Sequence, residues 1–176
     1  VIKIELTENE IIFSHHGKPF DYTSFRALVK QDSSKDRVGA KQVGKYGTGF
    51  MTTHAFNRLV HVSAPYIVKR GKDDISGYVQ VKDFHLDRTK VDTVKGPAIM
   101  EEQLDLVEAF CKQSLLNSIV DDATSFRYEL TTEQISQVSA QLTSAISLLP
   151  FVMVINSNIT KVEVHDNHSK KQYTYT

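Results

Sequence analysis

A polar stretch at residues 31–45 is the feature that most constrains how this chain can fold. It is rich in serine, lysine, aspartate and glycine and shows no apolar periodicity, so it supplies neither a core-facing helix nor a strand. Structureless segments longer than about 12–15 residues in a compact domain are usually lids or binding loops. The core must therefore come from the segments on either side, and the stretch itself predicts a loop over a ligand.

The residues before this stretch predict a hairpin followed by a helix. Residues 1–6 alternate apolar and polar side chains, and residues 11–13 continue as a second short strand after a polar turn. A helix that includes Phe25 is expected next, with Asp21 or Thr23 as its N-cap.

The residues after the stretch alternate between helical and strand patterns. The expected elements are a helix over 50–56, strands over 59–62 and 78–86 with a turn near Gly71, a helix over 100–119, a strand over 124–130, a helix over 135–149 capped by Thr131 or Thr132 and ended by Pro150, and strands over 151–155 and 159–164. This order predicts an α+β fold, a two-layer sandwich with helices on one face of a mixed, mostly antiparallel sheet. We expect one domain over 1–131, and a helix with strands over 132–176 that begins a following segment.

The amino-acid composition limits which kinds of molecule the protein is expected to bind. Lysine and arginine total 21, as do aspartate and glutamate, so the net charge is zero and gives no clear signal for nucleic acid or an anionic membrane. The longest apolar run, near residues 148–155, is about half of the roughly 18 residues that a membrane span needs. The single cysteine, Cys111, cannot form an internal disulfide and is expected to be buried and inert. We expect a cytoplasmic protein with no membrane partner.

Three glycines directly after the polar stretch are the strongest local signal for chemistry. Gly44, Gly47 and Gly49 allow positive φ and close approach of the backbone to a ligand, and the helix expected after them would direct free N–H groups at phosphate oxygens. Lys45 would add a positive charge. The spacing G-x-x-G-x-G is neither the dinucleotide fingerprint nor the phosphate-loop signature, so an ordinary turn remains the alternative.

Several polar residues also have a structural interpretation. His15 and the histidine after it could be turn residues, and no second ligand pair at a usual metal spacing accompanies them, so no metal site is expected. His54 is interpreted as a structural histidine on a helix. Asp87 and Arg88 predict a solvated or paired turn.

Taken together, these segments resemble the GHKL (Bergerat-fold) ATPase superfamily, which includes DNA gyrase, histidine kinases and the ninety-kilodalton heat-shock chaperones. The resemblance rests on IIFSHHGKPF and QVGKYGTGF, two glycine motifs with the polar stretch between them, and is closest to the sacsin-like branch. DATSFRYEL resembles the strand that carries the superfamily's threonine, and LPFVMVINSNITKVEV resembles the start of a coupling segment. The likeness covers most of the chain.

The resemblance implies an ATP site under a lid. Gly17 would lie at the adenine side, the later glycines would form the lid's hinge, and Thr124 would support adenine recognition. The implied nucleotide-binding residues are His15, Gly17, Ser34, Lys35, Gly44, Lys45, Gly47, Thr48, Gly49, Phe50 and Thr124.

Two departures from the superfamily pattern bear on activity. His15 stands where the adenine-binding aspartate is usual, and a neutral imidazole does not act as a carboxylate does. The asparagine that holds magnesium and the glutamate that activates water are expected on a helix before Val1, so no catalytic residue is assigned within this chain. ATP and Mg²⁺ are the cofactors implied for the intact parent.

Three functional hypotheses follow. The first is an ATP-binding module that acts as a nucleotide-gated, chaperone-like switch, with further domains of the parent or a second protomer as partners. The second is a degenerate relative that keeps the fold as an interaction or scaffold domain. The third, a histidine protein kinase, is disfavoured because no dimerisation helix pair with a phospho-acceptor histidine is evident.

Overall fold

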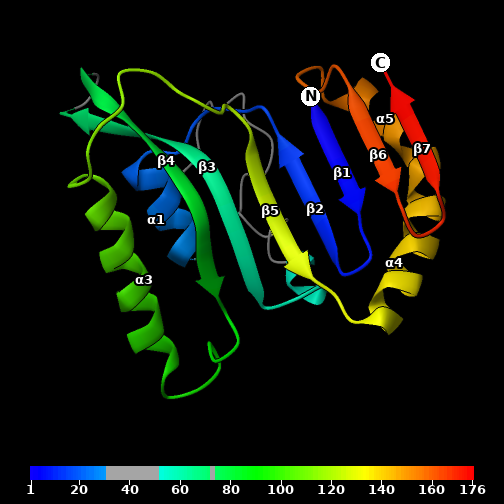
Figure 1. The fold of residues 1–176 in the computed structure, drawn as a ribbon, viewed down its shortest axis with the longest axis horizontal. Helices are drawn as coiled ribbons and strands as arrows, with labels where there is room; N and C mark the ends of the chain where they lie inside the picture. Colours follow the sequence, from blue (N-terminus) through cyan, green and yellow to red (C-terminus); the bar gives the residue numbers. More distant parts are fainter. Residues whose placement is uncertain (31–51, 72–73) are drawn as a thin grey trace. The chain divides into compact units, whose positions relative to one another are not determined.

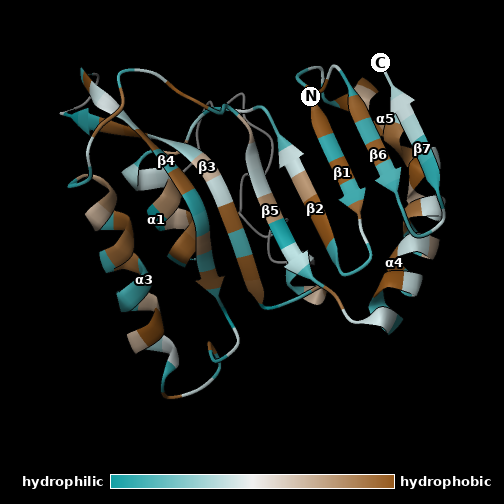
Figure 2. Ribbon diagram, in the orientation of Figure 1, coloured by the Kyte–Doolittle hydropathy of each residue, from teal (hydrophilic) through white to brown (hydrophobic). Residues whose placement is uncertain are grey.

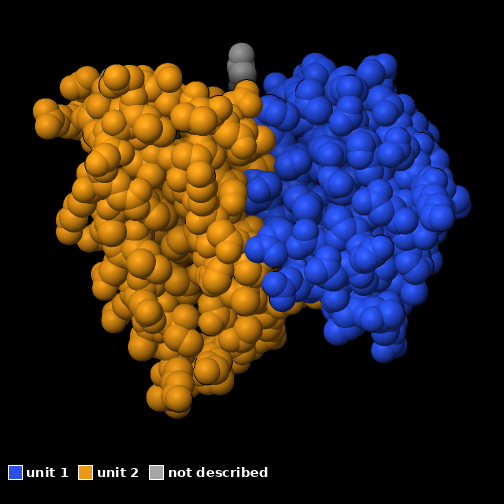
Figure 3. Space-filling model, viewed as in Figure 1, with its two compact units in different colours: residues 1–16, 125–176 blue, residues 17–124 orange. Residues whose placement is uncertain are grey.

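The computed structural model describes residues 1–30, 52–71 and 74–176. They form two compact units (Figure 3). One, here called the hairpin unit, lies within residues 17–124, and the other, here called the sheet unit, joins residues 1–16 to 125–176. The chain thus leaves the sheet unit after its first hairpin and returns to it at its third strand.

The hairpin unit is built on two long antiparallel strands. Strand β3 (Leu59–Arg70) and strand β4 (Asp74–Asp87) are joined at a turn where Gly71 has a φ of 75°. That φ lies in the left-handed region, which glycine adopts without the steric cost of a Cβ. The sequence located both strands and the turn but made each strand too short: the first was ended at residue 62, before Pro65, and the second was begun at residue 78, after Gly77.

Two helices and a short 3-10 turn complete the hairpin unit: α1 (Tyr22–Lys30), α3 (Gly96–Phe110) and η1 (Thr52–Ala55). Asp21 caps α1, since its carboxylate accepts a hydrogen bond from the Ser24 backbone N–H at 2.9 Å. This confirms one of the two expected caps. The expected helix at residues 50–56 is a 3-10 turn in the part that the structure describes.

Aromatic side chains from α1, α3 and both strands form the core of the hairpin unit. The Phe25 ring meets Phe84 at 5.0 Å, Phe110 at 5.5 Å and Tyr66 at 6.2 Å between centroids, each edge to face. All four residues are at most 8% exposed. Edge-to-face pairs of this kind add to the free energy of burying the rings, so this cluster fixes both helices against the hairpin. Figures 1 and 2 show α1 and α3 beside strands β3 and β4.

Helix α3 is shorter than the sequence predicts. It ends at Phe110, whereas helical spacing continues in the sequence to about residue 119. Beyond it the chain pairs with β4 instead: Tyr78 and Leu116 exchange backbone hydrogen bonds of 2.9 and 2.8 Å. This tertiary pairing satisfies the backbone groups that another helical turn would have used.

The sheet unit has a mixed sheet with strand order β5-β2-β1-β6-β7. Its strands are β1 (Ile2–Leu6), β2 (Glu10–His15), β5 (Thr124–Glu129), β6 (Val162–Asp166) and β7 (Lys171–Tyr175). The pairs β1–β2 and β6–β7 are antiparallel, and β1–β6 is parallel. The parallel pair is possible because the long helical segment before β6 carries the chain back across the sheet.

That helical segment corrects the sequence prediction. Helix α4 (Thr132–Ala145) begins with a capping box formed by Thr131 and Gln134, then continues through η2 (Ile146–Leu148) into α5 (Leu149–Ile155). Pro150 lies in the first turn of α5, a position that needs no backbone N–H, so it starts a helix rather than ending one. The strand predicted over 151–155 is therefore wrong.

The α4–η2–α5 segment packs on the sheet with only part of its surface. Ile146, Val162 and Val164 form a buried cluster, with Leu149 and Met153 packed against it. In contrast, Phe151, Val154 and Ile155 are 66%, 84% and 86% exposed. The end of this segment therefore presents apolar side chains that the described residues do not cover.

The same segment meets the length and composition of a membrane span. Thr132–Ile155 is 24 residues long, contains an 18-residue window with a mean hydropathy of 1.8, and only 17% of that window is buried. The sequence prediction of no such span considered only the run near 148–155 and missed the uncharged serine, threonine and alanine before it. One helix of this kind is weak evidence, because core helices pass the same test.

The α+β class predicted from the sequence is confirmed. The strands form mixed and mostly antiparallel pairings, and helices cover sheet faces within each unit. The division at residues 131 and 132 remains a prediction, since the compactness of the two units does not define where a coupling segment begins.

Arg88 is a buried structural residue, whereas a solvated or paired turn was expected for Asp87 and Arg88. Its side chain is 2% exposed, and its Nη2 atom donates to the backbone oxygens of Leu28, at 3.1 Å, and of Val29. Those carbonyls belong to the last turn of α1, where no intrahelical donor reaches them. A buried cation at a helix C-terminus also interacts favourably with the helix dipole.

Replacing Arg88 with methionine should therefore destabilise the protein. We expect Arg88→Met to lower the free energy of unfolding by about 1–3 kcal/mol, because the α1 carbonyls lose their donor in a buried environment. Arg58→Met is the control, since Arg58 pairs with Asp92 at 2.8 Å in an exposed position and should cost less than about 1 kcal/mol. Urea denaturation of both variants measures this, and equal losses would contradict the role given to Arg88.

Candidate functional site

All of the residues predicted to contact the phosphates lie outside the described residues. These are Ser34, Lys35, Gly44, Lys45, Gly47, Thr48, Gly49 and Phe50. Their arrangement remains a prediction. Among the predicted site residues, the structure describes His15, Gly17 and Thr124.

His15 ends β2 and lies among aromatic rings. Its imidazole stacks on Phe126 of β5 with centroids 6.3 Å apart and planes inclined by 29°, and the Phe13 ring is 6.0 Å away. Burial lowers the pKa of His15 below its usual value, and the charges of His16 and of the N-terminus lower it further. At neutral pH this side chain is therefore an uncharged planar ring that can donate or accept one hydrogen bond at each nitrogen.

Strands β2 and β5 are neighbours that run in opposite directions in the sheet unit. The Leu130 N–H donates to the Asn9 carbonyl at 2.8 Å, near the start of β2, while His15 at its end meets Phe126 near the start of β5. The C-terminal end of β2 and the N-terminal end of β5 therefore lie at the same end of the sheet. Gly17, two residues beyond β2, is exposed, and Thr124, the first residue of β5, is 1% exposed.

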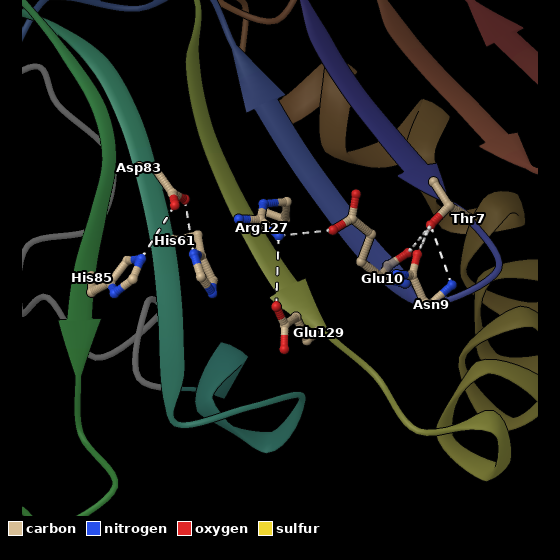
Figure 4. Close-up of polar contacts among 8 residues, drawn as sticks. All are labelled: Thr7, Asn9, Glu10, His61, Asp83, His85, Arg127 and Glu129. Carbon is tan, nitrogen blue, oxygen red and sulfur yellow. Dashed lines mark hydrogen bonds and ion pairs between the residues drawn. The ribbon is translucent and has the colours of Figure 1, made fainter.

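A polar network anchors the other end of these strands (Figure 4). Arg127 pairs with Glu10 of β2 at 3.1 Å and approaches Glu129 at 3.8 Å, and the Thr7 hydroxyl donates to the Glu10 carbonyl at 3.2 Å in the β1–β2 turn. The Arg127–Glu10 pair links β5 to β2, the Arg127–Glu129 approach lies within β5, and the Thr7 contact closes the β1–β2 turn. We interpret this network as structural.

A second polar cluster, on the hairpin unit, was not found by the sequence analysis. Asp83 of β4 contacts two imidazoles: its Oδ1 lies 2.8 Å from Nδ1 of His61, and its Oδ2 lies 3.2 Å from Nε2 of His85 (Figure 4). The spacing Asp-x-His at residues 83–85 was the available signal, since it places both side chains on one face of a strand. His61 joins them through the hairpin register, which pairs it with His85 and which the sequence does not reveal.

The hairpin unit also has a small cavity beside α1. Its volume is 190 Å³, and its lining includes Asp21, Tyr66, Lys69 and Cys111. Lys69 donates to Asp21 at 2.8 Å, and although burial raises the pKa of Asp21, the hydrogen bonds from Lys69 and Ser24 bring it below its usual value. Cys111 is exposed, which corrects the expectation of a buried thiol.

Comparison with known proteins adds no assignment: no family model matches the chain, and no curated protein or solved structure is significantly similar to it.

The environment of His15 predicts a measurable pH dependence. The unfolded chain protonates His15 near 6.5, whereas the folded chain takes up that proton only at lower pH. The unfolded state therefore binds more protons below about pH 6.5, and the free energy of unfolding decreases as the pH falls through this range. His15→Gln should remove this contribution, so that the stability of the variant falls less between neutral pH and about pH 5.

Urea denaturation at a series of pH values measures this difference. His168→Gln, in the turn between β6 and β7, is the matched control and should follow the unmodified chain. A His15→Gln profile parallel to that of the unmodified chain would contradict the assigned pKa direction.

Proposed function

We propose that this chain is an ATP-binding module of the GHKL type. The observation that carries the proposal is the position of the H-x-G turn. It begins at His15, the last residue of β2, at the end of the sheet where the neighbouring strand β5 starts. Of the proposed adenine-side residues, His15 is the last residue of β2, Gly17 follows it two residues later, and Thr124 is the first residue of β5.

The chemistry of His15 fits a purine base. Its ring is planar, uncharged at neutral pH and clustered with the rings of Phe13 and Phe126, so it offers a hydrogen-bonding group beside apolar, aromatic side chains. Ligand sites of this kind combine apolar walls with a few placed polar groups. The imidazole would bind adenine differently from the superfamily's aspartate, by one hydrogen bond to the base edge.

The remaining residues would act on the phosphates. Backbone N–H groups of Thr48, Gly49 and Phe50 would meet phosphate oxygens, while Ser34, Lys35 and Lys45 would reach them from the lid. Mg²⁺ and the water-activating carboxylate would be held by an upstream helix in the parent protein. Within this proposal the chain itself binds nucleotide weakly and does not hydrolyse it.

The proposed role in the parent is a nucleotide-gated switch. Closure of residues 31–45 around the γ-phosphate would be transmitted to the segment after Pro150, and from there to further domains or to a second protomer in the cytoplasm. The helical continuity of α4, η2 and α5 supports this, because a continuous helix moves as one rigid element.

A degenerate scaffold domain is the second candidate. The observation that favours it is His15 itself, which stands where a carboxylate is usual in the superfamily. Loss of that carboxylate would weaken adenine recognition while leaving the fold intact. The two candidates differ in one property, nucleotide binding, so a single experiment separates them.

The experiment is a thermal-shift titration with a non-hydrolysable ATP analogue and Mg²⁺. A version of the chain extended upstream by one helix should show a melting temperature that rises with analogue concentration, because a ligand that binds only the native state stabilises it. At about 100 times the dissociation constant the gain is about 2.7 kcal/mol. Unchanged melting at millimolar analogue would favour the scaffold function.

Glycine substitutions then test the site. Gly47→Val and Gly49→Val should each abolish the shift, because a branched side chain blocks the approach of the backbone to phosphate. Gly71→Asn is the matched control: a Cβ there meets no atom within 4 Å, and asparagine tolerates its positive φ. A Gly49→Val chain that keeps the full shift would remove the phosphate contacts from the proposal.

A further inference from the structure

We propose that His61, Asp83 and His85 form a binding site for a divalent transition-metal ion of the zinc class. One nitrogen from each histidine and a carboxylate oxygen of Asp83 all lie within 4.8 Å of one another. Two imidazoles and one carboxylate are a frequent protein ligand set for zinc and for non-haem iron. The three residues belong to the hairpin unit, and none of them is among the residues proposed to bind nucleotide.

The register of the hairpin places the two histidines together. His61 of β3 is directly opposite His85 of β4, and their rings are 4.6 Å apart at an angle of 71°. The next pair along, Val62 and Phe84, points to the other face of the hairpin because side chains alternate along a strand. Since Phe84 packs against Phe25 of α1, the histidines lie on the face away from the helices.

A β-bulge directs Asp83 toward both imidazoles. Between the pairs Val62–Phe84 and Ala64–Val81, the two residues Lys82 and Asp83 of β4 stand against Ser63 alone. Asp83 has a φ of 50°, and its backbone N–H donates to the Ser63 hydroxyl at 3.0 Å. A non-glycine residue with this φ is uncommon, and bulges occur preferentially where a side chain must be re-aimed, including next to active sites.

The distances suit a small metal ion after minor side-chain rotation. Ligand atoms at about 2.0–2.2 Å from a tetrahedral zinc ion are about 3.4 Å apart. The Oδ1–Nδ1 and Oδ2–Nε2 distances of 2.8 and 3.2 Å are slightly shorter than this. A metal ion would take the place of the hydrogens that join Asp83 to the two rings, and each of these hydrogens would move to the other nitrogen of its imidazole. The hydrogen-bonded cluster is thus a preorganised form of the site.

The exposure of the three side chains indicates an open coordination sphere. His61 is 9% exposed and provides a fixed ligand, whereas Asp83 and His85 are 53% and 56% exposed. The ion would therefore reach the site from solvent. Three protein ligands leave at least one position for water, as in zinc sites that bind or activate a small ligand rather than in closed structural sites.

The first test is titration of the metal-free chain with Co²⁺ and then Zn²⁺. Co²⁺ should bind at one equivalent and give visible absorption bands of a low-coordinate site, and Zn²⁺ should displace it. Asp83→Asn and His85→Gln should each weaken Zn²⁺ binding more than about 100-fold, because even changes to outer-shell partners of a metal ligand cost 10–100-fold. His168→Gln, which removes a histidine of the sheet unit, should bind as the unmodified chain does.

The Asp83→Asn variant distinguishes a loss of metal binding from a loss of the folded structure. Asparagine has the same shape as aspartate and also tolerates positive φ, so the variant should melt like the unmodified chain in EDTA. In Zn²⁺ the unmodified chain should melt at a higher temperature and Asp83→Asn should not, since binding stabilises only the native state. Equal Zn²⁺ affinity in the unmodified chain and both variants, or no uptake at one equivalent, would overturn the site. None of these measurements uses nucleotide, so failure here leaves the ATP proposal untouched.

Discussion

The hairpin unit depends on the antiparallel pairing of β3 with β4 and on the bulge that interrupts it. The regular part of the pairing directs Phe84 to the face where it meets Phe25 and Phe110, which fixes α1 and α3. The bulge at Asp83 changes the local direction of β4 and brings a carboxylate between two imidazoles on the opposite face. One ladder of backbone hydrogen bonds thus supports both the core and the candidate metal site.

The sheet unit is held together by strand pairing between distant parts of the chain and by a helical connection that packs on the sheet. Its central strands come from both ends of the chain, and the parallel pair β1–β6 requires the long helical connection of α4, η2 and α5. That connection buries Ile146 against Val162 and Val164, yet leaves Val154 and Ile155 largely exposed. An uncovered apolar helix end suits a segment that contacts something beyond these residues, which agrees with the coupling role proposed for it.

The two proposed sites would bind their ligands through different kinds of interaction. The nucleotide site would rely on backbone N–H groups at glycine turns and on a neutral, partly buried imidazole, so its specificity comes from shape and hydrogen bonding. The metal site relies on three side chains whose donor atoms converge. A metal ion on the hairpin unit would add rigidity to β3 and β4 without requiring a nucleotide.

The sequence by itself determined the local elements: the β1–β2 hairpin, the turn at Gly71, the α+β class and two candidates for each of two helix caps, from which the structure selects Asp21 and Thr131. These follow from side-chain periodicity and backbone preferences within a few residues. Tertiary structure alone decided the burial of Arg88 under α1, the helical state of residues 151–155 and the meeting of His61 with Asp83 and His85. The burial of Arg88 and the histidine–aspartate cluster each depend on a partner distant along the chain, and local periodicity carries no information about which distant residue that partner is. The helical state of residues 151–155 follows instead from the continuation of α4 through η2 into α5, where Pro150 lies in the first turn.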